Sequence, residues 1–156
     1  MVSDQGHSWV VHIDGAARNN PGPAGAGIFM KKDGEVVARE GFFLGSKTNN
    51  QAEYFGLLLA LYLLSQFVKP GDVIRIASDS ELLVNQIKGI YKIRHEGLMP
   101  LYQLAHKMMR SYSIEIMHVV RADNADADRL ANLGVDTKKP LPDAFKIMLK
   151  DHGITV

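Results

Sequence analysis

The sequence predicts an α/β fold in which a five-stranded mixed β-sheet is flanked by helices. Two observations lead to this prediction. The first third of the chain carries strand patterns separated by short turns, as hairpin-built sheets do. In the rest of the chain, strand and helix patterns alternate, which is typical of a sheet with helices packed on its faces. With 156 residues, 46% of them hydrophobic and 22% charged, the chain has the size and composition of one globular domain.

Three strands are expected before the first helix. They lie at 8–14, 25–31 and 35–44. The first ends at Asp14-Gly15, which favours a turn, and Asp33-Gly34 favours a hairpin between the other two. Residues 16–27 hold so much Gly and Pro that no regular element is expected at the start of this run.

The remaining elements alternate in character. A largely apolar helical pattern covers 50–68 and stops at Pro70-Gly71. We then expect a strand at 73–78, helices at 80–88 and 98–110, a strand at 113–120 and a helix at 124–134. Near the end of the chain, Leu141 and Phe145 begin an amphipathic helical pattern.

The composition excludes several classes of protein. The chain has no Cys, which excludes a disulfide scaffold, a Cys-ligated zinc site and a thiol nucleophile. Eighteen Lys and Arg against 17 Asp and Glu leave a net charge of +1, so bulk charge gives no sign of nucleic-acid binding. The start of the chain lacks the pattern of a secretory signal, and the apolar stretch 54–68 is too short to span a bilayer. We therefore expect a cytoplasmic monomer with no membrane association and no obligate protein partner.

Four acidic residues stand where the expected elements begin or end: Asp14, Glu53, Asp79 and Asp128. Taken singly, each has an ordinary explanation. Asp14-Gly15 is a turn sequence, and Asn50-x-x-Glu53 matches a capping box. Asp79 is expected in the first turn of a helix, where the helix dipole favours an anion.

Taken together, the four carboxylates point to a metal site. Asp14 and Asp79 each follow apolar strand residues, so both are expected at the ends of interior strands. Burying several like charges is unfavourable unless cations neutralise them, and two divalent ions would balance four carboxylates. Oxygen ligands without His or Cys favour Mg²⁺ or Mn²⁺ over zinc. Such a two-metal site suits in-line displacement at a phosphodiester.

Four segments resemble the motifs of type 1 ribonuclease H. They are IDGAARNNPGPAGAG at 13–27, TNNQAEY at 48–54, ASDSELLVNQIKG at 77–89 and RADNADADRLAN at 121–132. The resemblance runs in the family's order over about residues 8–134. In the fourth segment, the pattern Asn124-x-x-Ala127-Asp128 selects Asp128 over the two neighbouring aspartates.

The resemblance implies a ribonuclease H-like fold and an enzymatic activity. It makes Asp14, Glu53, Asp79 and Asp128 the catalytic residues and the ligands of two Mg²⁺ ions, for which Mn²⁺ would substitute. It implies endonucleolytic cleavage of the RNA strand of an RNA–DNA hybrid, leaving 3′-hydroxyl and 5′-phosphate ends. The catalytic domain is then expected at 1–136, with 137–156 as a C-terminal helical extension of the same domain.

The resemblance also suggests the groups that bind the substrate. A 2′-hydroxyl distinguishes RNA from DNA and is both a donor and an acceptor, which suits amide side chains and turn backbone. The candidates for contact with the hybrid are Gly15, Asn19, Asn20, Gly22, Asn49 and Asn50. Thr48 is a candidate for a DNA-strand phosphate, and Arg121 for a phosphate or for developing negative charge. Asn-rich turns are, however, also common punctuation between elements.

Two features depart from the family pattern. The segment 88–100 is short and carries few basic residues, so the basic handle of many bacterial members is absent and a weaker electrostatic grip is expected. The connection 120–123 is too short for the Gly-His loop of many members, and His118 falls in an expected strand. No catalytic His is therefore assigned.

Two other hypotheses remain open. A 3′–5′ exonuclease could use the same carboxylate architecture, but such enzymes typically begin with Asp-x-Glu, and the third position here is Ala16. A hybrid-binding module without chemistry is disfavoured because all four acids are present.

Overall fold

The computed structural model describes residues 6–156, so the first five residues of the expected domain lie outside the described part. Along the chain its elements follow the predicted order, with one 3-10 turn, η1 (Arg121–Asn124), added before the fourth helix. The strands are β1 (Ser8–Ala17), β2 (Gly22–Lys32), β3 (Glu35–Lys47), β4 (Val73–Ser78) and β5 (Ser113–His118). The helices are α1 (Asn49–Leu64), α2 (Glu81–Ile87), α3 (Met99–Met109), α4 (Ala125–Thr137) and α5 (Asp143–Asp151).

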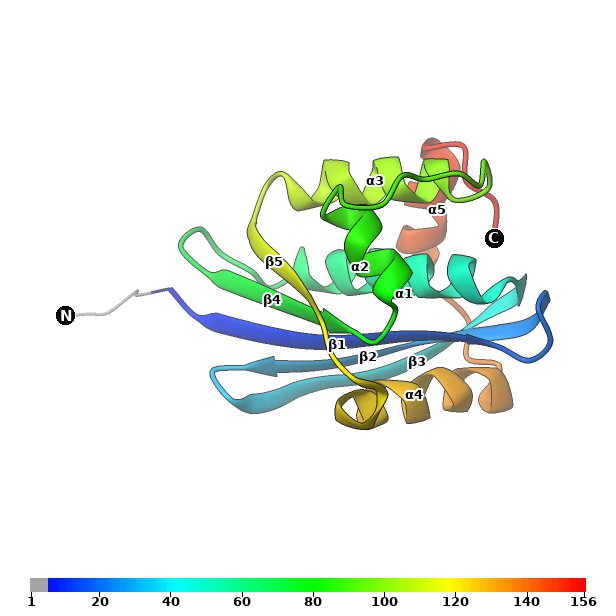
Figure 1. Cartoon of the computed structure of the whole chain (residues 1–156). Helices are drawn as coiled ribbons and strands as arrows, with labels where there is room; N and C mark the ends of the chain where they lie inside the picture. Colours follow the sequence, from blue (N-terminus) through cyan, green and yellow to red (C-terminus); the bar gives the residue numbers. More distant parts are fainter. Residues whose placement is uncertain (1–5) are drawn as a thin grey trace.

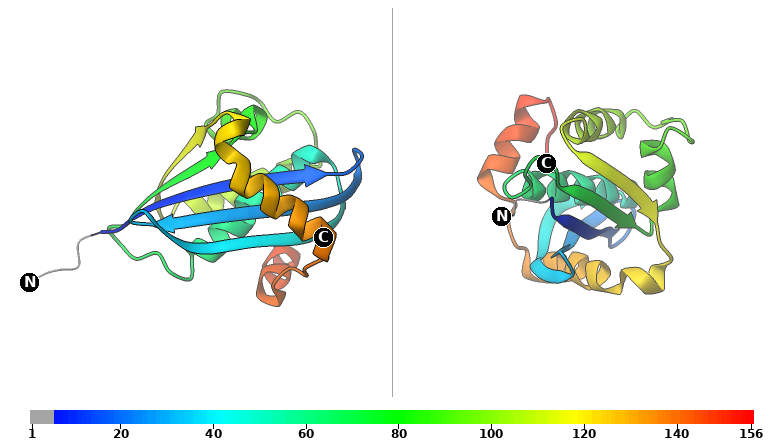
Figure 2. Two further views of the ribbon diagram at one scale, coloured as in Figure 1. Left: turned by 90° about the horizontal axis from the view of Figure 1, so that it is seen from below. Right: turned by 90° about the vertical axis from the view of Figure 1, so that its left-hand side faces the viewer.

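The five strands form one mixed sheet in the order β3-β2-β1-β4-β5, which confirms the predicted fold class. β1, β2 and β3 pair antiparallel, whereas β1, β4 and β5 pair parallel. Helix α4 lies alone on one face of the sheet, and α1 crosses the other face together with α2, α3 and α5 (Figure 1). Figure 2 shows α4 running obliquely across the antiparallel strands.

The core lies between the sheet and α1. This helix is apolar around most of its circumference because the sheet covers one side and other helices cover the opposite side. The C-terminal extension joins this core: the ring of Phe145 in α5 meets the ring of Tyr62 edge-on, with centroids 5.5 Å apart. Among residues 6–156, no helix is both long enough and apolar enough to cross a bilayer.

The Gly- and Pro-rich run is more regular than the sequence predicts. β1 continues to Ala17, and β2 begins at Gly22. The expectation was wrong because the glycines here provide space instead of breaking the strand. A Cβ on Gly25 would stand 2.1 Å from the carbonyl oxygen of Ala131, so only glycine allows α4 to rest directly on β2.

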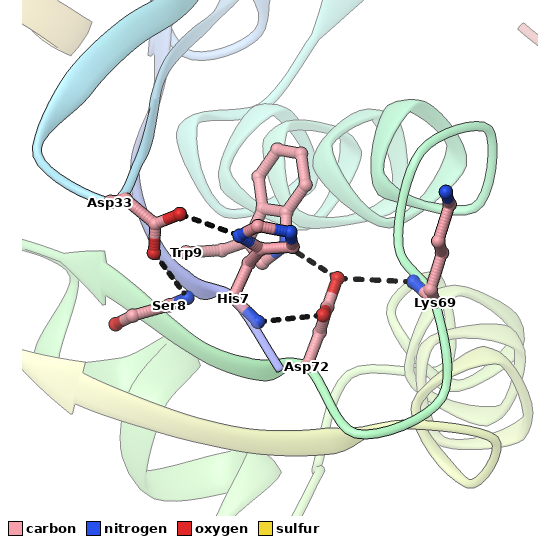
Figure 3. Close-up of polar contacts among 6 residues, drawn as sticks. All are labelled: His7, Ser8, Trp9, Asp33, Lys69 and Asp72. Carbon is pink, nitrogen blue, oxygen red and sulfur yellow. Dashed lines mark hydrogen bonds and ion pairs between the residues drawn. The ribbon is translucent and has the colours of Figure 1, made fainter. Parts of the chain in front are cut away.

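At the opposite end of β1, a single carboxylate fastens the start of the sheet (Figure 3). Asp72 is 6% exposed and accepts the backbone N–H of His7 at 2.8 Å, the indole N–H of Trp9 at 2.9 Å and the backbone N–H of Lys69 at 3.1 Å. Burial favours the neutral acid, but these donors outweigh it and hold the pKa of Asp72 below its usual value.

Candidate active site

β1 and β4 bring the first two predicted acids side by side. The parallel pairing ends with Ile13 opposite Ser78, so Asp14 and Asp79 are the next residues on the two strands. Asp14 lies inside β1 and not at its end as predicted, because β1 continues alongside β2. Asp79 precedes α2 instead of lying in its first turn. Ser80 is the N-cap and accepts the N–H of Leu83, which leaves the Asp79 carboxylate free of a capping role.

Glu53 is also released from helix capping. The predicted box of Asn50 and Glu53 was wrong, because Thr48 is the N-cap of α1 and exchanges hydrogen bonds with Gln51. Glu53 lies one turn further along, and its Oε1 accepts the backbone N–H of Gly15 at 2.5 Å. The helix can approach this closely because residue 15 has no side chain: a Cβ there would stand 2.1 Å from the carbonyl carbon of Ala52.

Three carboxylates converge at this point. One oxygen from each of Asp14, Glu53 and Asp79 lies within 4.8 Å of the other two. Asp14 is 5% exposed. Burial and the charge of Asp79 raise the pKa of Asp14 to about 7. Burial and the charges of Asp14 and Asp79 likewise raise the pKa of Glu53 well above its ordinary value.

These pKa shifts describe a site that is short of positive charge. A divalent cation would relieve the repulsion that raises them, and a set of carboxylate oxygens suits a hard cation. The three acids can therefore hold a metal ion.

Asp128 reaches the same cleft from α4. It is the fourth residue of that helix, and its proximity contributes to the raised pKa of Asp14. It does not belong to the group of three mutually close carboxylates. The cleft has a volume of about 480 Å³. It is lined by Asp14, Gly15, Ala16, Ala17, Arg18, Asn49, Glu53, Asp79, Arg121, Asp128 and Asn132.

The structure brings only some of the predicted substrate-binding residues into this cleft. Gly15, Asn49 and Arg121 line the cleft with the acids. Asn20 is tied to them indirectly, because its Oδ1 accepts the N–H of Asn49 at 2.9 Å. Asn49 in turn accepts the N–H of Ala17 at 3.0 Å, so these bonds join the β1–β2 turn to the start of α1.

The other candidates lie outside that lining. Thr48 caps α1. Asn19 lies in the β1–β2 turn with a φ of 70°, and Gly22 is the first residue of β2. Asn50 faces a neighbouring cleft of about 520 Å³, which it lines together with Tyr91, Lys92, Arg94 and other residues of α2 and the segment that follows it.

Sequence reasoning missed two polar side chains of the cleft, those of Arg18 and Asn132. Arg18 forms an ion pair with Asp136 at 2.7 Å, and its guanidinium also reaches the carbonyl oxygen of Asn132 at 3.3 Å. Asn132 donates to the carbonyl of Asp128 at 3.0 Å. The helical spacing of Asp128 and Asn132 was the available signal, since residues four apart lie on one face of a helix.

The chain is similar to proteins of known family. The sequence model of a family described as reverse transcriptase-like matches residues 12–134. A ribonuclease HI of Halobacterium salinarum is 37% identical over 135 residues, which cover 85% of this chain and 67% of that protein. A bifunctional protein of Mycobacterium tuberculosis is 38% identical over 131 residues, which cover 81% of this chain and 35% of the relative. The chain thus spans about a third of the mycobacterial protein.

Solved structures agree with these relatives. The crystal structure of RNase H1 from Halobacterium salinarum matches with a TM-score of 0.78 and 36% identity, covering 83% of this chain and 98% of that chain. LC11-RNase H1, solved in complex with an RNA/DNA hybrid, matches with a TM-score of 0.78 and 32% identity, covering 83% and 97% of the two chains. The family match ends at residue 134, so α5 lies outside it.

Proposed function

We propose that this chain, which belongs to the type 1 ribonuclease H family, cleaves the RNA strand of RNA–DNA hybrids endonucleolytically and leaves 3′-hydroxyl and 5′-phosphate ends. The observation that carries the proposal is the convergence of Asp14, Glu53 and Asp79, with one oxygen of each within 4.8 Å of the others, in a cleft that Asp128 also lines. A hybrid is the proposed substrate because LC11-RNase H1, which this chain resembles in structure, was solved in complex with an RNA/DNA hybrid.

The four carboxylates would hold two Mg²⁺ ions, with Mn²⁺ as a substitute. Bound there, such ions supply an activated water and stabilise charge on the leaving 3′ oxygen. The side chains must be ionised to act as ligands, so protons compete with metal at Asp14, whose pKa is about 7. Gly15 keeps the Glu53 carboxylate in place through its N–H.

Two further groups would act on the nucleic acid. The turn tied together by Asn20 and Asn49 presents amide and backbone groups next to the acids, which suits recognition of a 2′-hydroxyl. Arg121 reaches the same cleft from η1 and supplies a fixed positive charge for a phosphate. We assign Gly15, Asn19, Asn20, Gly22, Thr48, Asn49, Asn50 and Arg121 to substrate binding.

The test uses an RNA–DNA hybrid labelled inside the RNA strand and blocked at all ends. The protein is expected to release short RNA oligonucleotides with 5′-phosphates in Mg²⁺ or Mn²⁺ and none in EDTA. Double-stranded RNA and double-stranded DNA should remain intact. Asp14→Asn and Asp79→Asn should abolish cleavage while leaving the circular dichroism spectrum unchanged. Near-normal cleavage by either variant would exclude the assignment.

The same assay separates the alternatives. An exonuclease on this architecture would fail on the blocked hybrid, and Ala16 already lacks the second acid typical of such enzymes. A binding module would retain the hybrid without cutting it. We also propose that the chain is a cytoplasmic monomer, and size-exclusion chromatography with light scattering measures its mass directly.

A further inference from the structure

Asn124 joins the helix that carries Asp128 to the strand that carries Asp14. The side chain is 1% exposed, and its Nδ2 donates to the carbonyl oxygen of Ile13 at 2.9 Å. Ile13 is paired with Ser78, the last residue of β4, so the backbone of β1 beyond it has no strand partner on that side. Asn124 therefore fastens α4 to β1 one residue before Asp14.

Asn124 makes this bond without capping its own helix. It is the N-cap residue of α4, a position where Asn ordinarily caps its own helix, yet its side chain makes no capping hydrogen bond. Its Oδ1 is buried without a hydrogen-bond partner among the described residues. Because Oδ1 is the atom that would accept a capping N–H, its lack of a partner destabilises the fold, and a purely structural residue at this position would favour Ser, Thr or Asp as a cap.

A glycine sets how closely the same helix approaches the sheet. Gly27 is paired with Asp14 across β1 and β2, and a Cβ on it would stand 2.1 Å from the carbonyl oxygen of Ala127. The backbone of α4 thus rests directly on the strand next to Asp14. Asn124 thus fixes the position of α4 along β1, and Gly27 fixes its distance from the sheet. Asp128 lies one turn after Asn124 and one residue after Ala127.

We infer that Asn124, assisted by Gly27, is a positioning residue that holds the Asp128 carboxylate in the cleft beside Asp14, Glu53 and Asp79. Neither residue touches the reacting atoms, and the inference rests on the proposed function. Asn124 acts on Asp128 through the rigid first turn of α4. A displaced Asp128 would leave the group of three close acids intact and weaken only the share of metal binding that depends on α4.

The test compares two variants with a control of similar stability. Asn124→Ser keeps a good N-cap but is too short to reach Ile13, and Gly27→Ala lifts the helix. Ile74→Val removes one buried methyl group at the far end of β4, where Ile74 pairs with Trp9. Each 156-residue protein is titrated with Mn²⁺ by calorimetry in the absence of substrate. The kcat and KM for a hybrid are then measured at saturating metal, together with the Tm.

We expect Asn124→Ser and Gly27→Ala to weaken Mn²⁺ binding and to lower kcat by roughly tenfold or more, with KM changed much less. Ile74→Val should lower the Tm yet keep metal affinity and kcat. Asn124→Ser with the metal affinity and kcat of the control would overturn the inference. If the unaltered protein binds Mn²⁺ but cleaves no hybrid, the proposed function fails, while the metal titration still decides the role of Asn124.

Discussion

Gly15 and Glu53 meet where α1 lies close against the sheet: the N–H of Gly15 donates to Glu53 Oε1 at 2.5 Å. A Cβ on Gly15 would stand 2.3 Å from the backbone nitrogen of Glu53 itself. The position of this acid is therefore set by a backbone contact between two elements that are distant in the sequence. This contact can be tested without altering any acid.

Gly15→Ala should push α1 away from β1 and carry Glu53 out of the acid group. We expect hybrid cleavage to fall by about 10²-fold, because a displacement of about 1 Å at a reacting centre has that effect. Overpacking should also lower the free energy of unfolding by about 1–3 kcal/mol. Gly45→Ala is the control, since Gly45 has open space around it but a φ of 75°. It should lose stability and keep cleavage, so equal activities of the two variants would contradict the prediction.

Without metal, the stability of the protein should fall as pH rises. The pKa of Asp14 is raised to about 7 from its ordinary value of 3.8, so the folded state binds more protons than the unfolded state between these values. The free energy of unfolding then decreases with rising pH across about pH 4–7 and levels off above. Glu53, whose pKa is also raised, adds to the effect.

Thermal unfolding in EDTA at several pH values measures this dependence. Asp14→Asn should have a higher Tm than the unaltered protein at pH 8 and a flatter pH profile, because it removes one buried charge. Adding Mg²⁺ at pH 8 should raise the Tm of the unaltered protein much more than that of the variant. A steeper pH profile in Asp14→Asn would show that the carboxylates of the site do not repel one another as described.

Asp72 should contribute strongly to stability and nothing to chemistry. Asp72→Asn leaves one acceptor oxygen for three buried or half-buried donors, so we expect a loss of about 1–3 kcal/mol. Asp33→Asn is the control: Asp33 also accepts two hydrogen bonds, from His7 and Ser8, but its side chain is 51% exposed. That change should cost much less stability, because solvent screens the interactions of an exposed carboxylate. Urea unfolding measures both, and cleavage at 25 °C should be normal in both.

The cleft beside Asn50 should govern affinity more than rate. Lys92 and Arg94 are exposed there next to Tyr91, whose hydroxyl donates to Glu81 at 2.9 Å. Replacing both basic residues with Ala should raise KM for the hybrid and leave kcat almost unchanged. The slope of log affinity against log salt should fall by roughly 1 for each lost phosphate contact. Replacing Lys150, which is exposed on α5, and Arg110, which is exposed just after α3, should change neither quantity.

The strands and the identity of the acids could be predicted from the sequence because they depend on local patterns. The strand at 73–78 has the predicted bounds, since its alternation of exposed and buried residues is a local property. Asp14 and Asp79 follow apolar strand residues that pair in the sheet, so adjacent strands had to bring them together. The four segments that resemble ribonuclease H motifs also predicted the fold class.

The rest depends on contacts between distant elements. The run at 16–27 looked irregular because two of its glycines, Gly25 and Gly27, make room for α4, which lies a hundred residues further along the chain. Glu53 looked like a capping residue because Asn50 stands three residues before it. Thr48 and Gln51 match the same pattern equally well, and only the hydrogen bonds in the structure show that they form the box. Arg18 was missed because its partners are residues of α4.

β1 carries its anchor at its start and its reactive group just past the end of its pairing with β4. Trp9 is fastened by Asp72 at the start of the strand, and Asp14 meets the other acids six residues after the first pairing with β4. Natural variation can therefore adjust thermal tolerance at one end without disturbing the chemistry at the other. Relatives adapted to different temperatures should differ around Trp9 and Asp72 while keeping the surroundings of Asp14 unchanged.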